Sequence, residues 1–167
     1  MADDRIYLVG FLGAGTTTVG KLLAERLGGS FIDLDSEIEK AEGKTVAKIF
    51  AESGEAHFRG LERVHLRRAS VEPRTVIALG GGAYIDAVNR EYVEEHGCSV
   101  HLEVSLSSVG ERIEVDGSRP LFTDPHRLAD LYRQRLPSYR MARVAVRTDG
   151  VEPEEIVELI LESVDWP

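Results

Sequence analysis

The 167-residue chain lacks several features that would define whole classes of protein. It has one cysteine, Cys98, so no disulfide can form within the chain and a reducing compartment is compatible with it. No stretch approaches the roughly 18 consecutive apolar residues of a membrane-spanning helix, and no apolar signal segment precedes the first expected strand. An excess of positive charge is also missing, because the formal net charge is −9. Nucleic-acid binders need a basic surface. We therefore expect a cytoplasmic protein that binds neither membranes nor nucleic acid.

Metal-ligand patterns are missing as well. The five histidines have no metal-ligand spacing and Cys98 has no second cysteine, so a structural zinc site is not expected. The chain is 43% hydrophobic and 29% charged, as in ordinary globular proteins, and its length suits one domain that covers residues 1–167.

Short apolar segments alternate with longer segments of helical periodicity. This alternation predicts βαβ units, and hence an α/β fold with a parallel sheet. Strands are expected near residues 5–9, 30–33, 75–79, 98–103 and 143–147. Helices are expected near residues 16–27, 34–41, 45–52, 55–70, 86–95, 105–113, 126–142 and 153–163.

A glycine-rich segment joins the first expected strand to the first expected helix. Residues 10–18 read GFLGAGTTT and match the phosphate-binding pattern G-x-x-x-x-G-K-[ST] at every fixed position except one. Thr16 stands where the pattern has lysine. The glycines let backbone N–H groups converge on a polyphosphate, and the helix start adds partial positive charge. We predict a nucleotide site, without the lysine charge, that is formed by Gly13, Ala14, Gly15, Thr16, Thr17 and Thr18.

Two carboxylates occur where the second expected strand ends. Asp33 and Asp35 flank Leu34, and ligands of open parallel sheets bind at the carboxyl ends of the strands. If the chain is still extended there, the two side chains share one face. One would then hold Mg²⁺ through water, and the other would orient or deprotonate an acceptor hydroxyl. Alternatively, Asp35 caps the helix that follows it.

Two further segments contain candidate substrate-binding residues. Arg59 offers a planar fork to a substrate carboxylate, although its i,i+3 spacing also allows a surface pair with Glu62. Gly80, Gly81 and Gly82 end the third expected strand, where glycine lets backbone N–H groups come close to a ligand. The alternative for these glycines is a flexible turn.

More arginines occur around a loop that we expect to act as a lid. Residues 114–125 contain two prolines and a turn-prone Asp-Gly-Ser run, and a loop of about a dozen residues is long enough for that role. Arg112 precedes the loop and Arg119 lies within it, so either could reach a bound polyphosphate. Arg140 lies near the end of an arginine-rich helix. Each arginine alone could also be a solvated surface residue.

The order of these motifs resembles that of the shikimate kinase family from Ile6 to about Leu161. The resemblance rests on the P-loop, Asp33-Leu34-Asp35, Gly54-Glu55-x-x-Phe58-Arg59-x-x-Glu62, Leu79-Gly80-Gly81-Gly82, Arg119-Pro120-Leu121 and Tyr139-Arg140. It implies a three-layer P-loop kinase fold, with helices on both faces of a five-stranded parallel sheet. It also implies an acceptor-binding region at about residues 34–62, a lid at about 112–125, and a monomer.

The resemblance further implies that the γ-phosphoryl group of ATP moves to the 3-hydroxyl of shikimate. Arg59 and Arg140 would bind the shikimate carboxylate, and the turn Gly80–Gly82 would approach the acceptor. Asp35 and Gly81 would hold the shikimate hydroxyls, with Asp35 also the candidate base.

The family's nucleotide-binding roles carry over in the same way. Thr17 would hold Mg²⁺ directly and Asp33 would hold it through water. Arg119 would reach the transferring phosphate, and Arg112 would flank the adenine.

Thr16 is where the chain departs from the family pattern. Removing one preorganised contact to developing charge costs about 2.7–4 kcal/mol. Threonine offers a hydroxyl but no charge, and Lys21 is expected about 140° further around the helix. Natural divergence, an engineered inactivating change and a difference of no physiological weight all remain open explanations.

Two other functions remain open from the sequence. One is a non-catalytic protein that binds shikimate or nucleotide. The other is a kinase for another small sugar acid, such as gluconate.

Overall fold

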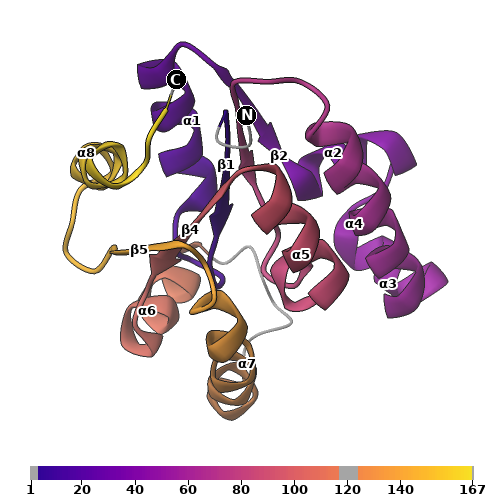
Figure 1. The fold of residues 1–167 in the computed structure, drawn as a ribbon. Helices are drawn as coiled ribbons and strands as arrows, with labels where there is room; N and C mark the ends of the chain where they lie inside the picture. Colours follow the sequence, from indigo (N-terminus) through magenta and orange to yellow (C-terminus); the bar gives the residue numbers. More distant parts are fainter. Residues whose placement is uncertain (1–3, 117–123, 167) are drawn as a thin grey trace.

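The fold is built around a parallel sheet of five strands (Figure 1). The computed structural model describes the backbone of residues 4–116 and 124–166, and side chains in 4–111 and 124–166. The strands lie in the order β2-β3-β1-β4-β5, which confirms the predicted parallel sheet. Their bounds are β1 Arg5–Val9, β2 Ser30–Asp33, β3 Thr75–Ala78, β4 Cys98–Glu103 and β5 Val144–Arg147.

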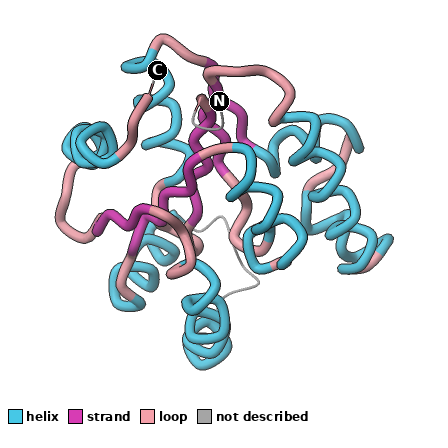
Figure 2. The backbone as a smooth tube through the Cα atoms, in the orientation of Figure 1, coloured by secondary structure: helices cyan, strands magenta, loops and turns pink. Residues whose placement is uncertain are grey.

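Helices connect the strands and cover the sheet on both sides, as Figure 2 shows in cyan and magenta. The helices α1 and α8 pack together on one side, where Gly20 of α1 fits against the Phe31 ring of β2. On the other side, Tyr7 of β1 reaches Ser70 at the end of α4. The helices of the described residues are α1 Thr16–Leu27, α2 Leu34–Glu42, α3 Val46–Ser53, α4 Glu55–Ala69, the 3-10 helix η1 Ala83–Ile85, α5 Ala87–His96, α6 Leu106–Asp116, α7 Pro125–Tyr139 and α8 Pro153–Ser163.

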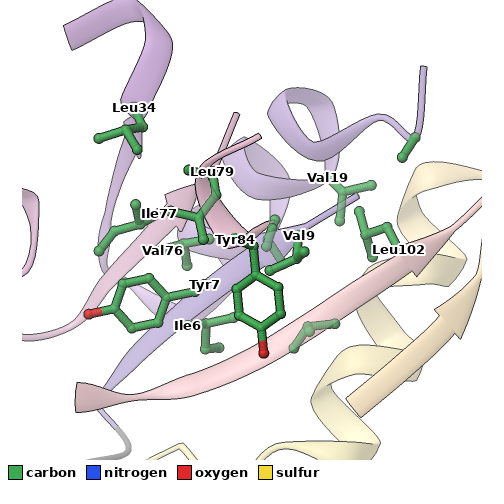
Figure 3. Close-up of a cluster of buried hydrophobic side chains, with 14 of the residues drawn as sticks. Ile6, Tyr7, Val9, Val19, Leu34, Val76, Ile77, Leu79, Tyr84 and Leu102 are labelled. Carbon is green, nitrogen blue, oxygen red and sulfur yellow. The ribbon is translucent and has the colours of Figure 1, made fainter. Parts of the chain in front are cut away.

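The core lies along the central strands (Figure 3). Ile6, Tyr7 and Leu8 of β1 are fully buried, as are Val76 and Ile77 of β3. Consecutive residues of a strand point to opposite faces, so these strands are covered on both sides. Burying one such side chain contributes about 1.5–3 kcal/mol, which makes the central strands a rigid support for the loops that follow them.

The largest differences from the sequence prediction are two helix ends and one short helix. The helix expected near 126–142 ends at Tyr139, and Arg140 is its C-cap. The helix expected near 105–113 continues to Asp116, which shortens the predicted lid loop. The short helix η1 was not predicted, because three residues are too few to show a helical period.

In the described part of the chain, every helix is either too short or too polar to cross a membrane.

Candidate active site

The glycine-rich loop leaves the end of β1 and leads directly into α1. Gly13 has φ 79° and Gly15 has φ 84°, a left-handed conformation that glycine adopts without the strain a β-carbon would cause. The Ala14 amide donates to the Phe11 carbonyl at 3.0 Å, and both side chains are buried. The bond and the two buried side chains therefore fix the loop to the core. All six residues predicted to bind nucleotide lie in this loop or in the first turn of α1.

Thr16 is the first residue of α1, and its side chain is half-buried. Its methyl group lies 3.7 Å from the place that a β-carbon on Gly10 would take, so the side chain turns back over the base of the loop. Lys21, the nearest lysine along the chain, is exposed on α1. The structure thus gives the loop its backbone shape and helix start, but no lysine at the usual position.

Thr17 and Asp33 join the loop to the second strand. The Thr17 hydroxyl donates to the Asp33 carboxylate at 2.7 Å. The other carboxylate oxygen of Asp33 accepts from the Ser36 amide at 3.1 Å and so caps α2. A hydroxyl and a carboxylate are oxygen ligands of the kind that Mg²⁺ takes alongside water and substrate phosphates. The pair therefore fits a magnesium ion, although the described residues contain no cluster of three or more His, Cys, Asp or Glu side chains suited to a metal.

The structure corrects the expected geometry of the two aspartates. Strand β2 ends at Asp33 and α2 begins at Leu34, so the chain is not extended through Asp35. The helix cap is Asp33, and Asp35 lies in the first turn of α2. Asp35 still faces the site, because its carboxylate oxygen Oδ1 lies 2.6 Å from where a β-carbon on Gly80 would be.

Arg59 lies on α4 in a largely enclosed position, with its side chain 25% exposed. Its guanidinium pairs with Glu62 at 2.7 Å and with Glu55 at 3.4 Å, and it lies over the rings of Phe50 and Phe58. Burial alone would lower the pKa of Arg59. The hydrogen bond and the charge of the Glu62 carboxylate have a larger effect in the opposite direction, so the Arg59 pKa is raised. The side chain is a permanent cation held in one direction. The surface pairing considered from the sequence is instead a buried one.

Glu62 is the buried partner of that ion pair, with 1% of its side chain exposed. Burial raises the pKa of the Glu62 carboxyl to about 7, although Arg59 acts in the opposite direction. The nearby charge of Asp35 raises the Glu62 pKa further, and Arg135 lowers it. Asp35, Arg59, Glu62 and Arg135 therefore share one electrostatic environment.

The sequence prediction missed Arg135, which lies on the inner side of α7. Its Nη1 atom lies 2.9 Å from where a β-carbon on Gly81 would be, and the Tyr139 hydroxyl lies 3.5 Å from that point. Arg140, which the sequence placed here, is the exposed C-cap of α7, and its charge acts on His101 and Tyr132. The structure therefore brings Arg135 to this site in place of Arg140.

The signal that could have identified Arg135 is helical spacing. Leu128, Tyr132, Arg135 and Tyr139 are separated by four, three and four residues, which places them on one face of a helix. Arg140 is one residue further, and so points about 100° away from that face.

The turn Gly80–Gly82 is the point at which these side chains meet. A β-carbon on Gly80 would touch the Asp35 carboxylate, and one on Gly81 would touch Arg135. A β-carbon on Gly82 would lie 2.7 Å from Cζ of Arg59. Each glycine thus leaves space for a different side chain. The turn also lies near the P-loop, since that β-carbon on Gly81 would be 3.9 Å from the Gly10 carbonyl oxygen.

The residues after this turn hold it in place. Tyr84 is fully buried, and its hydroxyl donates to Glu94 of α5 at 2.7 Å. Asn89 donates from its side chain to the Ala83 carbonyl at 3.1 Å. The turn is therefore a fixed part of the sheet edge, and the flexible-turn interpretation is not supported.

Two predicted residues cannot be placed at the site. Arg119 lies outside the described residues. Arg112 lies in α6, but its side chain is outside the described part of the structure.

The arrangement combines two kinds of anion site at one edge of the sheet. Backbone N–H groups and a helix start form a phosphate cradle. Beside it, Arg59 and Arg135 offer two guanidinium groups suited to a carboxylate, and Asp35 lies against the same glycine turn. This combination suits phosphoryl transfer from a nucleotide to a small hydroxylated acid.

Known proteins resemble this chain along almost its whole length. The family model for shikimate kinase matches residues 12–165. A shikimate kinase of Persephonella marina is 42% identical over 158 residues, which are 94% of this chain and 96% of the relative. Among solved structures, the shikimate kinase from Acinetobacter baumannii in complex with shikimate matches with a TM-score of 0.90 at 38% identity, covering 96% of this chain and 92% of that one. A gluconokinase from Sinorhizobium meliloti matches with a TM-score of 0.60 at 20% identity, covering 96% and 91%, and so shares the fold alone.

Proposed function

Because the chain belongs to the shikimate kinase family, we propose that it transfers the γ-phosphoryl group of ATP to the 3-hydroxyl of shikimate. The observation that carries the proposal is the turn Gly80–Gly82, around which Asp35, Arg59 and Arg135 converge beside the P-loop. A small carboxylic acid with several hydroxyls suits two guanidinium groups and one carboxylate at a single turn.

On the acceptor side, Arg59 and Arg135 bind the substrate carboxylate. Arg135 takes the role that the sequence assigned to Arg140. Glu62 holds Arg59 in position from behind, since the 2.7 Å ion pair limits where the guanidinium can point. A fixed guanidinium loses little conformational freedom when the carboxylate arrives.

Asp35 is the candidate base. From the first turn of α2 it lies against Gly80, where it accepts a hydrogen bond from the acceptor hydroxyl and takes its proton during transfer. The backbone of Gly80, Gly81 and Gly82 lines the site next to the Asp35 carboxylate and the two guanidinium groups. In such a site catalysis consists mainly of positioning and charge neutralisation.

On the nucleotide side, the amides of residues 13–18 hold the phosphates. Thr17 and Asp33 would hold Mg²⁺, which supplies positive charge to the phosphate oxygens when bound. Arg119 would reach the transferring phosphate and Arg112 would flank the adenine, two roles that follow from the sequence motif alone. The working form of the protein is proposed to be a monomer.

Thr16 favours a second candidate function. Without the lysine charge, a site that binds both substrates would transfer the phosphoryl group slowly, and in the extreme it would only bind them. A binding protein of this kind keeps the acceptor residues Asp35, Arg59 and Arg135 but lacks turnover.

The test is ATP-dependent phosphorylation with Mg²⁺, with shikimate and gluconate as alternative acceptors. It compares the chain with Thr16→Lys and with Thr16→Met, which has a long side chain but no charge. We expect phosphorylation of shikimate only, with Thr16→Lys faster by about 10²–10³-fold and Thr16→Met unchanged.

Each outcome separates the candidate functions. Shikimate binding in calorimetry with no transfer by the chain, and transfer by Thr16→Lys, would assign a binding protein on a kinase scaffold. Phosphorylation of gluconate, or no shikimate binding by either protein, would overturn the substrate assignment.

A further inference from the structure

A buried tyrosine joins the last turn of α7 to the acceptor-side glycine turn. Tyr139 is 1% exposed, and its hydroxyl donates a hydrogen bond to the Gly81 carbonyl oxygen. The motif Tyr139-Arg140 contains this residue, but the sequence assigned a role only to Arg140. Its position is informative because Gly81 lies between the glycines that contact Asp35 and Arg59.

The same hydroxyl also interacts with Arg135. Arg135 Nη1 and the Tyr139 hydroxyl lie 2.9 Å and 3.5 Å from one point, the place that a β-carbon on Gly81 would take, so the guanidinium is close to the hydroxyl that donates to Gly81. Arg135 and Tyr139 are four residues apart on α7, so they lie one above the other on a single face. One oxygen atom therefore bonds a backbone peptide and lies beside a cationic side chain of the proposed acceptor site.

The tyrosine ring is held from behind by β4. The ring of His101, which is 2% exposed, packs against Tyr139 with 5.4 Å between ring centroids. Burial lowers the His101 pKa although the nearby Glu103 charge raises it, and the charge of Arg140 lowers it further, so the ring behind Tyr139 is neutral near pH 7. Burial also raises the pKa of the Tyr139 hydroxyl to about 12, which keeps it a donor at any physiological pH.

We propose that Tyr139 is a positioning residue for the acceptor, holding the Gly81 peptide and the Arg135 guanidinium in their binding geometry before substrate arrives. The inference rests on the proposed function, because it assigns the acceptor to this turn. In a trans peptide the carbonyl and the following N–H point in opposite directions. The bond from Tyr139 therefore turns the Gly82 N–H away from α7.

The test variant is Tyr139→Phe, which keeps the ring and removes the hydroxyl. It leaves the Gly81 carbonyl without its side-chain donor and removes the polar atom that lies beside the Arg135 guanidinium. A buried polar group left unsatisfied carries a substantial penalty, so we expect shikimate to bind about 10-fold more weakly in calorimetry. The affinity for a non-hydrolysable ATP analogue should stay within about twofold, since neither group belongs to the P-loop.

Tyr7→Phe is the matched control. The Tyr7 hydroxyl is also buried, also has a pKa raised to about 12 by burial, and donates to Ser70 Oγ at 2.8 Å at the other end of β1. Both variants should lower thermal stability, but only Tyr139→Phe should weaken shikimate binding. Equal shikimate affinity in the two variants would reduce Tyr139 to a structural residue and overturn the inference.

A second readout needs no acceptor and so separates this inference from the proposed function. In nuclear magnetic resonance of the free protein, Tyr139→Phe should shift the Gly82 amide and the Arg135 Nε–H resonances and accelerate Gly82 amide exchange. Tyr7→Phe should leave both resonances in place. Unchanged Gly82 and Arg135 resonances in Tyr139→Phe would overturn the inference even if the chain binds a different acceptor. Failure of the unaltered chain to bind shikimate would instead overturn the proposed function.

Discussion

At Gly82 the missing β-carbon gives the Arg59 guanidinium its space. We predict that Gly82→Ala displaces Arg59 from its ion pair with Glu62, because the added methyl carbon would lie 2.7 Å from Cζ of Arg59. Shikimate affinity should fall about 10- to 100-fold, which corresponds to the loss of about one charge-assisted hydrogen bond. Calorimetric titration with shikimate measures the change.

Gly60→Ala is the control for that substitution. Gly60 is the next residue along α4 after Arg59, and a β-carbon there would meet nothing within 4 Å. Alanine in a helix interior is favoured over glycine by about 0.5–1 kcal/mol, so this variant should be slightly more stable and bind shikimate normally. If Gly60→Ala weakened binding as much as Gly82→Ala, steric displacement of Arg59 would not be the cause.

Glu62 makes the stability of the protein depend on pH in a direction unusual for a carboxylate. Burial raises the pKa of Glu62 to about 7 in the folded state, above its ordinary value of 4.5. The folded chain therefore keeps this proton up to a higher pH than the unfolded chain does. The contribution to stability is therefore full below about pH 4.5 and is lost as the pH rises to about 7. At most it amounts to about 3.5 kcal/mol, since one pKa unit corresponds to about 1.4 kcal/mol.

Glu62→Gln removes this titration and keeps the size of the side chain. As the pH rises from about 4.5 to 7, the unfolding free energy of the unaltered chain should fall relative to that of the variant. Urea unfolding at several pH values measures it. A difference that stays constant over that range would show that Glu62 is ionised throughout.

At the scale of secondary structure, α7 decides which arginine reaches the glycine turn. Arg135 and Arg140 are both on or beside this helix, but only Arg135 faces the glycine turn. We predict that Arg135→Ala weakens shikimate binding at least about 10-fold, whereas Arg140→Ala changes it less than about twofold. The opposite result in calorimetry would restore the prediction from sequence.

The sequence predicted the elements well because their signals are local. Apolar runs marked the strands, and glycine or aspartate residues marked where helices begin or end, so the order of elements followed from alternation alone. The family resemblance assigned the carboxylate to Arg140 through the pair Tyr139-Arg140, and that assignment did not consider the phase of the helix. The spacing of Leu128, Tyr132, Arg135 and Tyr139 contains that phase, and the burial of Tyr139 shows that this face of the helix turns inward.

The aspartates show a second limit. The spacing of Asp33 and Asp35 predicted a shared strand face, but β2 ends at Asp33 because its side chain caps α2. A single carboxylate can end a strand and begin a helix, and a period of two cannot reveal that change. The two residues still reach the site, each from a different element.

At the scale of the whole molecule, the strand order explains why distant segments meet. Strands β2, β3 and β1 are neighbours and parallel, so the residues that follow them emerge at the same edge. Asp33, Gly80 and Gly10 are far apart in sequence and follow or end these three strands. Parallel topology therefore assembles the site, and the sequence could predict it as soon as the strands were identified.

Surface composition at the same scale predicts a monomer. Large apolar side chains that are exposed in the described residues, Val64, Val71, Val88, Met141 and Leu159, come from five different places in the chain, and the net charge of −9 repels other copies. Sedimentation velocity at about 0.15 M salt should give the mass of one 167-residue chain. A dimer that persists on dilution would contradict this prediction.

The adjoining glycines Gly80, Gly81 and Gly82 also restrict which codon changes the gene can tolerate at these positions. Every missense change of a glycine codon introduces a residue with a β-carbon, since the genetic code offers nothing smaller. At Gly80, Gly81 and Gly82 that carbon would approach Asp35, Arg135 or Arg59, respectively. Any amino-acid replacement in these nine nucleotides therefore brings an atom into contact with one of the proposed substrate-binding groups, and only synonymous changes leave this turn as it is.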